Sequence, residues 1–454
     1  MSAALPLPDL PVQTPAPSAV RSSRENYVLY GVTSLLMFLV LGFGGRGPWP
    51  VYIFQAGSAA LLLAWFLEQS SSALTIRWHP LFAPMIAFAG LVGIQLLPGL
   101  SAYWYATYSQ ALQFVSYGIV CFLVVQSLNH SRQVRKLATA LSIFGAAVAL
   151  FAVLQNLSSP NRLYWLLKPR AGGWIYGPYV NHNHYAGLME MLVPIPLVFA
   201  FTHFSHRRKR WVAASIAAFM AATIFLSGSR GGMIAFAAEL VLFLYLLLRE
   251  KQKRSAGFLL VAFFCVVVAV VSWTGGREVK ARIATMGSDR HSDLSSDVRL
   301  QIDRDVLLMA LKHPVLGWGQ GTFAEVYPRF RSFYTDLRVN AAHNDYLQLL
   351  SETGIAGFAI MVWFLVTAIR AGIAKSQTWT SNLNGAVSVA AIVGISGILV
   401  HSLVDFNLQM PANAALFYCL CVVAGLEPRF TSHHRSHRIR RSEFVNDPGQ
   451  PLNA

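Results

Sequence analysis

The chain has 454 residues, of which 55% are hydrophobic and only 12% are charged, and its mean hydropathy is +0.47. Soluble domains carry about 25% charged residues, so this composition excludes an ordinary soluble protein. The formal net charge of +16 therefore bears on membrane topology and anionic lipid headgroups more than on nucleic acid. All four cysteines lie inside apolar runs, so we expect no disulfide framework.

Apolar blocks of about 17–22 residues recur along the chain, and this is the length at which a helix crosses a bilayer. They predict an all-α polytopic membrane protein with about twelve transmembrane helices and one large, partly helical loop. Residues 1–25 are rich in proline and are expected to form a disordered tail. Nine spans are expected in 26–273 and three in 354–427, with the large loop at 274–353 and a basic tail at 428–454. The predicted spans are 27–43, 51–67, 81–98, 110–128, 137–155, 184–204, 211–227, 232–249, 256–273, 354–372, 384–404 and 411–427.

Lysine and arginine cluster in short loops at 132–136, 207–210, 249–254 and 370–375 and in the C-terminal tail. With twelve spans, all of these segments share one side with the N-terminus. The positive-inside rule makes that side cytoplasmic. We therefore expect both termini in the cytoplasm and the 274–353 loop outside it.

The outer loops are basic as well, and this suggests an anionic ligand. Arg162 and Arg170 lie in the 156–183 loop, and a guanidinium is well shaped to bind phosphate. Solvated surface charge is the other interpretation of such residues. The aromatic residues crowded on the same side are typical of an interfacial belt and would also suit sugar rings.

The large loop is expected to contain a helix from Ser295 or Ser296 to about Leu311, because a serine can cap it and Pro314 follows it. Its apolar face is formed by Val298, Ile302, Val306 and Met309. Residues Asp303 and Asp305 point away from each other on a helix, so we interpret them as a solvated face that binds no metal. The run Gly317–Gly321 predicts a tight turn.

Two short polar motifs interrupt the apolar runs on the outer side. Ser227–Gly232, SGSRGG, combines small residues with Arg230, which indicates either an ordinary turn or a cradle for phosphate. Asn181 and Asn183 lie in NHNH at the start of the sixth span, as ligand contacts or as helix caps. Glu190, Glu239 and His401 lie within spans, where ionisable groups are costly and usually face the bundle interior. We assign these three no role.

The stretch Ala341–Gly357, AAHNDYLQLLSETGIAG, closes the long polar loop. If it is helical, His343 shares one face with Leu347 and Leu350. A histidine near the first turn of such a helix lies by the positive end of the helix dipole, which disfavours imidazolium, and a general base must be neutral. The alternative is a histidine that caps or packs where a helix enters the membrane.

Four segments together resemble the O-antigen ligase and polymerase family, whose members are bacterial inner-membrane glycosyltransferases of the GT-C type. They are NHNHYAG (Asn181–Gly187), SGSRGG, the helix from Arg299 that leads into HPVLGWGQGTF, and AHNDYLQLLSETGIAG. The resemblance covers residues 25–427. It implies transfer of a glycan from undecaprenyl pyrophosphate to an acceptor hydroxyl at the periplasmic face, with inversion and without a metal or cofactor.

By the matching motifs, His343 would be the catalytic base and Arg230 a pyrophosphate contact, while Arg299, Asn181, Asn183 and Asn344 would be further substrate contacts. The expected partners are the lipid-linked donor, a lipid or glycan acceptor and membrane lipids, with no nucleic acid. A ligase would place the glycan on lipid A–core, and a polymerase of the same family would join repeat units. A transporter or flippase is the alternative from a different class, and it should show internal repeats and charges near the membrane midplane.

Overall fold

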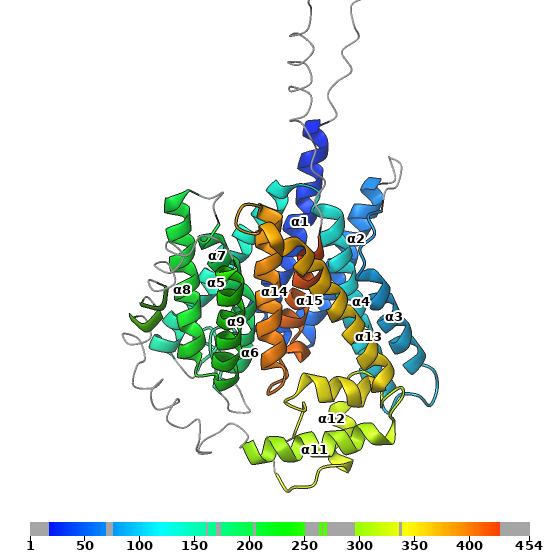
Figure 1. Ribbon diagram of the computed structural model, residues 1–454. Helices are drawn as coiled ribbons and strands as arrows, with labels where there is room; N and C mark the ends of the chain where they lie inside the picture. The colour runs from blue at the N-terminus through cyan, green and yellow to red at the C-terminus, as the bar shows by residue number, and fades with distance from the viewer. Residues whose placement is uncertain are drawn as a thin grey trace, which may run out of the picture.

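The computed structural model describes residues 18–69, 76–159, 162–168, 174–202, 206–249, 263–265, 267–269, 296–335 and 338–426. Its regular elements are helices, most of which run side by side in one bundle (Figure 1). The main helices are α1 (Ser18–Leu41), α2 (Pro48–Gln69), α3 (Phe82–Gln95), α4 (Trp104–Ser127), α5 (Ser131–Ser158), α6 (His182–Leu192), α7 (Pro194–Ala200), α8 (Arg207–Ser227), α9 (Arg230–Leu248), α11 (Ser296–Lys312), α12 (Phe323–Val326), α13 (Asp345–Lys375), α14 (Leu383–His401) and α15 (Pro411–Gly425). Short 3₁₀ turns lie at Phe43–Gly45, Tyr327–Arg329, Ser376–Thr378 and Asn407–Gln409. The predicted all-α membrane fold is confirmed.

Within the described residues, seven helices are long and apolar enough to cross a membrane: α2, α4, α5, α8, α9, α13 and α14. Shorter apolar helical segments lie at Asn26–Leu41, Phe82–Gln95 and Pro411–Gly425. Most of the predicted span 256–273 lies outside the described residues, as do 1–17, 270–295 and 427–454. The total of about twelve spans therefore stays a prediction.

Two predicted boundaries differ from the structure. Helix α1 begins at Ser18, so the end of the stretch expected to be a disordered tail is helical. The predicted span 184–204 is two helices, α6 and α7, that meet at Val193. Pro194 and Pro196 have no backbone N–H to donate, which explains the interruption.

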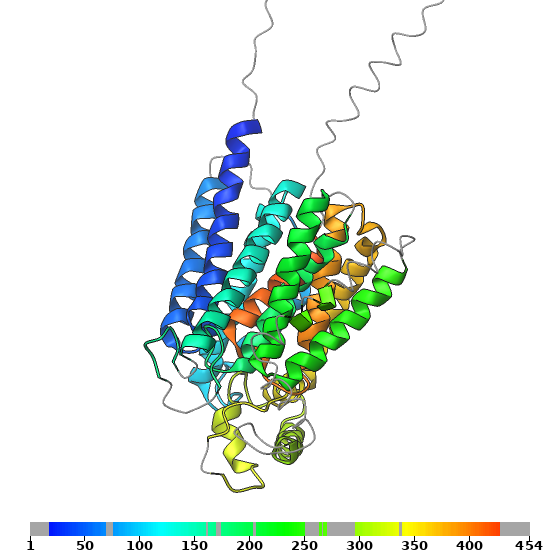
Figure 2. The ribbon, with the colours of Figure 1, turned by 90° about the vertical axis from the view of Figure 1, so that its left-hand side faces the viewer.

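The beginning of α1 and the end of α15 lie at one end of the bundle, and α11 and α12 lie at the other (Figures 1 and 2). Gly45, just after α1, packs against Pro411 at the start of α15. At the far end of α15, Gly425 packs against His79. The described chain ends therefore share one side, which is the arrangement that the predicted topology requires.

Helix α14 occupies the centre of the bundle. In its most apolar window 78% of residues are buried, against 50% or less in the other six candidate spans. Small residues permit this close packing, since Gly394 lies against the backbone of Met191 in α6 and Gly397 lies against Glu239 in α9. Helix α14 therefore lies close to both α6 and α9.

Helices α11 and α12 form a small layer with its own core on one end of the bundle (Figure 2). The predicted helix and its apolar face are confirmed, because Ile302, Val306 and Met309 are fully buried. The prediction for Asp305 is wrong: this carboxylate is buried and accepts hydrogen bonds from the Tyr327 hydroxyl at 3.1 Å and the Ser332 N–H at 3.0 Å. The turn of helix predicted to face solvent instead packs on α12.

A buried carboxylate in α13 clamps this layer to the bundle. Glu352 accepts hydrogen bonds from the N–H groups of Gly321 at 2.8 Å and Phe323 at 3.2 Å. The predicted tight turn at Gly317–Gly321 is confirmed, with Gly317 at φ 68° and its Cα against the Glu352 backbone. Gly354 interrupts the helical dihedrals of α13 with φ 63° and ψ −170°, and it lies against the backbone of Val315.

Gly354→Ala should destabilise the protein. The backbone conformation of Gly354 is essentially restricted to glycine and costs about 1–3 kcal/mol for other residues, and an added Cβ would lie 2.3 Å from the Val315 carbonyl oxygen. Thermal unfolding of the purified protein in detergent should show a lower Tm. Gly93→Ala is the matched control, because Gly93 is inside α3 with open space around its Cα. An equal Tm for both variants would contradict the proposed clamp.

Candidate active site

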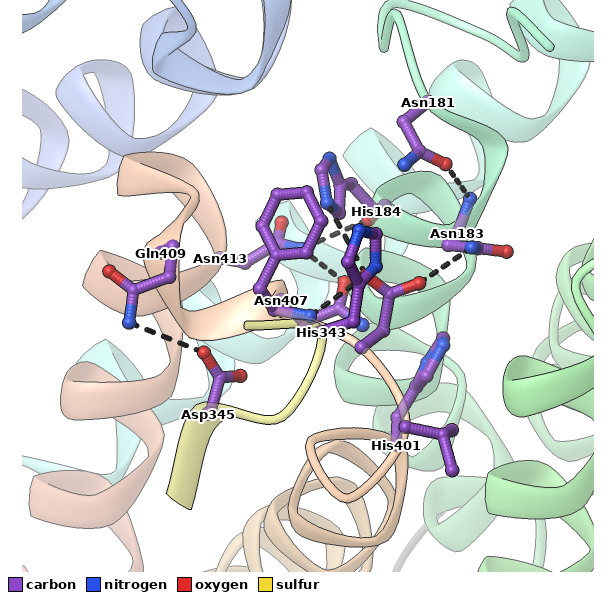
Figure 3. A network of polar contacts seen from close by, with 12 residues as sticks. Asn181, Asn183, His184, His343, Asp345, His401, Asn407, Gln409 and Asn413 are labelled. Carbon is purple, nitrogen blue, oxygen red and sulfur yellow. Dashed lines mark hydrogen bonds and ion pairs between the residues drawn. The ribbon is translucent and has the colours of Figure 1, made fainter. Parts of the chain in front are cut away.

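The site lies at the end of the bundle that faces α11, where α6, α9, α13 and α14 end or begin. Its centre is Asp405, in the loop between α14 and α15, whose side chain is 1% exposed. Side chains from α6 and from the segment before α13 converge on this carboxylate, and Figure 3 shows Asn183, His184 and His343 close together. Segments more than 200 residues apart in the chain therefore meet at one charge.

The NHNH motif supplies one wall of the site. Asn181 caps α6 by accepting a hydrogen bond from the Asn183 N–H at 2.8 Å. The Asn183 side chain is buried and donates to Asp405 Oδ2 at 2.6 Å, and His184 Nε2 lies 3.9 Å from Oδ1. In this structure, then, Asn181 caps the helix and Asn183 holds Asp405.

His343 approaches the same carboxylate at Oδ1, the oxygen that His184 also faces. Its Nδ1 lies 3.7 Å from Asp405 Oδ1, slightly beyond hydrogen-bond length, and the imidazole meets the Phe406 ring edge to face at 4.7 Å. The His343 side chain is 20% exposed, whereas its Nδ1 is buried. The imidazole thus turns Nδ1 toward the carboxylate and leaves Nε2, which has no hydrogen bond to a described residue, for a substrate.

The expectation that His343 shares a helix face with Leu347 and Leu350 is wrong. Its φ is 55°, and α13 begins at Asp345. Asn344 is the cap, since its side chain accepts hydrogen bonds from the N–H groups of Tyr346 and Leu347. An N-cap residue has a non-helical backbone conformation, and the residues before it lie outside the helix. His343 therefore does not share a helix face with Leu347 and Leu350.

Asp345 locks the loop that carries Asp405. Its N–H donates to the Ser402 carbonyl at 2.9 Å, and its carboxylate accepts from the Ser402 hydroxyl at 2.8 Å and the Leu408 N–H at 3.0 Å. These hydrogen bonds join the start of α13 to the 402–408 loop. His343 and Asp405 flank this connection, which fixes their spacing.

The charges around the site favour an ionised Asp405. Burial by itself raises the pKa of this carboxyl. The nearby imidazole of His343, together with the charges of His184 and His401, outweighs burial and holds the pKa of Asp405 well below the usual range. An ionised carboxylate stabilises the tautomer of His343 with a proton on Nδ1, and Nε2 is then free to accept a proton.

The four arginines predicted to contact substrate differ in where they lie. Arg299 reaches the site, where its Nη1 donates to the Val404 carbonyl at 3.0 Å. Arg230 is the half-buried first residue of α9, directly after the capping Ser229. Arg162 lies in an exposed turn, and no described contact joins it to the Asp405 loop, while Arg170 lies outside the described residues.

A further acidic residue near the site is Asp303, in α11. Asp303 in α11 is half-buried, and burial raises its pKa, an effect that the hydrogen bond to Asn344 and the charge of Arg299 reduce. Asn344 therefore joins the α11 layer to the segment that carries His343. It acts as a helix cap and as a neighbour of Asp303 at the same time.

A cavity of about 450 Å³ opens beside the site, among α2, α4, α13 and α15. Asp345, Ser402 and Gln409 line the end near the site, and Arg46 lies at the same rim. The walls are largely apolar, with Phe88, Phe114, Phe358, Met361, Leu365 and Phe417. The cavity can hold a hydrocarbon chain beside polar and cationic groups.

The described residues contain no group of three or more histidine, cysteine or acidic side chains arranged to hold a metal ion. Asp405 Oδ1 has one nitrogen of each of two histidines near it, His343 Nδ1 at 3.7 Å and His184 Nε2 at 3.9 Å. A carboxylate placed in this way can orient the imidazoles.

Two residues of this site were not predicted from the sequence. Asp405 is a lone acid just beyond the predicted span 384–404, and its position at a membrane edge was the available signal. Arg46 follows the GFGG run after α1, where Gly44 and Gly45 pack against Tyr179 and Pro411. In sequence it resembles any basic residue at the end of a span.

Comparison with known proteins finds a family model that matches the middle of the chain. No curated protein matches the chain closely enough to be compared with it. A family model described as O-antigen ligase matches residues 215–362, a segment that includes Arg230, Arg299, His343 and Asn344. This match supports membership of the chain in the O-antigen ligase/polymerase family.

Proposed function

We propose that this protein is an O-antigen ligase-like glycosyltransferase of the bacterial inner membrane. It moves a glycan from undecaprenyl pyrophosphate to a hydroxyl of lipid A–core at the periplasmic face, with inversion and without a metal. The observation that carries the proposal is the pairing of His343, from the segment matched by the family model, with the buried Asp405. This pairing leaves Nε2 of the imidazole available, and the nearby Asp345 lines a largely apolar cavity.

In the proposed reaction His343 Nε2 takes the proton from the acceptor hydroxyl as the oxygen attacks the anomeric carbon. The new C–O bond forms as the bond to the pyrophosphate oxygen breaks, and attack from the opposite face inverts the anomeric centre. Asp405 stabilises the imidazolium that results. The pyrophosphate leaves as an anion, so it needs positive charge more than a proton, and Arg230 and Arg299 would supply that charge.

The cavity supports a lipid-borne substrate. Its apolar walls suit part of a polyprenyl or acyl chain, and Arg46 at the rim suits an anionic headgroup. Both the donor and lipid A–core are anchored in the membrane, so a site at the membrane edge can reach both. With basic cytoplasmic loops on the opposite side, the active site would face the periplasm and both termini the cytoplasm.

A repeat-unit polymerase of the same family would use the same chemistry with a different acceptor. Deletion of the gene separates the two. A ligase mutant should lose glycan from lipid A–core and accumulate long lipid-linked glycan, whereas a polymerase mutant should carry single repeat units on lipid A–core. Electrophoresis of lipopolysaccharide with analysis of the lipid-linked pool measures both. Unchanged patterns in both pools would overturn the proposed function.

His343→Ala should lower transfer per folded enzyme by roughly 10²–10⁴-fold, the usual contribution of a general base. His343→Gln should not restore activity, because an amide cannot accept and carry a proton. Single-turnover transfer with purified lipid-linked donor measures the effect, and donor binding should change little. His206→Ala is a control at an exposed histidine at the start of α8. Full activity of His343→Gln would end the base assignment.

Asp405→Asn should lower kcat and shift the acid limb of the pH–rate profile to lower pH. An asparagine can keep the Asn183 contact through its carbonyl, but it turns an N–H toward His343 and favours the tautomer with the proton on Nε2. Loss of the negative charge also makes protonation of the neighbouring imidazole less favourable, so the acid limb moves down. The loss should not exceed that of His343→Ala. A pH–rate profile identical to that of the wild type would show that Asp405 does not act on the base.

A further inference from the structure

A buried histidine–glutamate pair lies inside the bundle, next to the candidate active site. His401, the last residue of α14, and Glu190, in α6, are 1% and 0% exposed, and Nδ1 lies 2.8 Å from Oε1. Ionisable side chains inside a membrane bundle are costly and usually serve function. The proposed chemistry does not use either group.

The pair lies against the turn that carries Arg230. A Cβ added at Gly231 would lie 2.8 Å from both Cδ2 and Nε2 of His401, and one at Gly232 would lie 3.1 Å from Glu190 Oε1. The backbone of the SGSRGG turn therefore rests on these two side chains. A Cβ at either position would require a shift of the turn or of its neighbours, which at Gly232 include the Cβ of Ala186 at 2.7 Å.

The direction of Arg230 follows from this support. Helix α8 ends at Ser227, Gly228 adopts φ 73°, and Ser229 caps α9 by accepting from the Gly232 N–H at 3.1 Å. Arg230 is the first residue of α9 and immediately precedes the two glycines. A shift of Gly231 or Gly232 would therefore move the Cα from which the guanidinium extends.

The same histidine also anchors the loop that carries Asp405. The His401 carbonyl accepts hydrogen bonds from the N–H groups of Val404 at 3.0 Å and Asp405 at 3.1 Å. The Val404 carbonyl in turn accepts from Arg299. One side chain thus supports the Arg230 turn, while its backbone begins the loop of the orienting carboxylate.

The Glu190–His401 pair leaves two buried polar atoms without a hydrogen bond to the described part of the chain, which lowers its contribution to the stability of the fold. His401 Nε2 and Glu190 Oε2 are buried and have no hydrogen-bond partner among the described residues. Each unmet polar atom in a buried site costs free energy. An apolar pair of similar volume would avoid this cost, so retention of the ionisable pair points to a requirement for its geometry.

We infer that Glu190 and His401 are positioning residues that hold the Arg230 turn in place relative to the Asp405 loop. The inference rests on the proposed function, because it assumes that Arg230 binds the pyrophosphate of the donor. Neither residue touches a substrate. Their contribution is transmitted through the backbone of Gly231 and Gly232 and through the 401–405 turn.

The test is a double-mutant cycle on purified full-length enzyme with lipid-linked glycan as donor. Arg230→Lys should be impaired, because an ammonium cannot reproduce the planar fork of a guanidinium. Glu190→Ala should lower kcat/KM for the donor on the order of tenfold, mainly through KM, since residues in one contact network are coupled. Glu190→Gln, which keeps an oxygen for His401, should recover most of that loss. The double variant Glu190→Ala with Arg230→Lys should be no worse than Arg230→Lys alone.

Glu239→Ala is the matched control. Glu239 is an equally buried carboxylate of α9, but it packs against Gly397 rather than against the Arg230 turn. This variant should leave kcat/KM per folded enzyme unchanged. Where Glu190→Ala yields no folded protein, His401→Asn takes its place in the cycle, because asparagine can donate to Glu190 but lacks the ring under Gly231.

The outcomes distinguish failure of the positioning role from failure of the proposed function. Losses that multiply in the double variant, or an equal effect of Glu190→Ala and Glu239→Ala, would overturn the positioning role while leaving the proposed function intact. A fully active Arg230→Lys would count against the proposed function itself and against the inference with it. Losses that fail to add, with recovery by Glu190→Gln, would establish the positioning role.

Discussion

The site depends on a single negative charge, the carboxylate of Asp405, buried where the bundle meets the α11 layer. A buried carboxylate is costly unless its oxygens find donors and nearby positive charge, and here it draws partners from distant parts of the chain. Asn183 donates to one oxygen, and His184 and His343 face the other. The requirement to satisfy this charge therefore places His343 and decides that its Nδ1 is the nitrogen that faces the carboxylate. The contacts that stabilise the buried carboxylate are therefore the same contacts that orient His343.

The surrounding structure keeps this arrangement rigid through close backbone approaches. Gly317 and Gly354 let the α11 layer pack onto α13, where Glu352 ties the two together by accepting backbone N–H groups. On the other side, Gly231 and Gly232 let the Arg230 turn lie on the Glu190–His401 pair. Side chains at these positions would separate the elements by more than the tolerance of a catalytic site. The glycine-rich motifs are thus positions of contact between segments rather than flexible loops.

Several local expectations failed because tertiary contacts override local preference. Asp305 was predicted to lie on a solvated helix face, yet Tyr327 and Ser332, which follow α12, donate hydrogen bonds to it. His343 was predicted at the start of a helix, but the capping side chain of Asn344 starts α13 after it and leaves His343 at φ 55°. Neither partner is visible from the i, i+3 and i, i+4 spacing on which such expectations rest. Long-range hydrogen bonds decided both cases.

The amino-acid sequence by itself determined the all-helical membrane fold, the positions of most long apolar helices and the amphipathic helix of the large loop, because bilayer thickness and helical periodicity act on contiguous residues. It also marked His343, Arg230 and Arg299 through short motifs. Only the tertiary structure decided that Asp405 is the partner of His343, that Asn183 serves this carboxylate, and that Glu190 and His401 lie beneath the Arg230 turn. These relations join residues separated by tens to hundreds of positions. Their physical cause is the packing of α6, α9, α13 and α14 around a common buried charge, which no local pattern encodes.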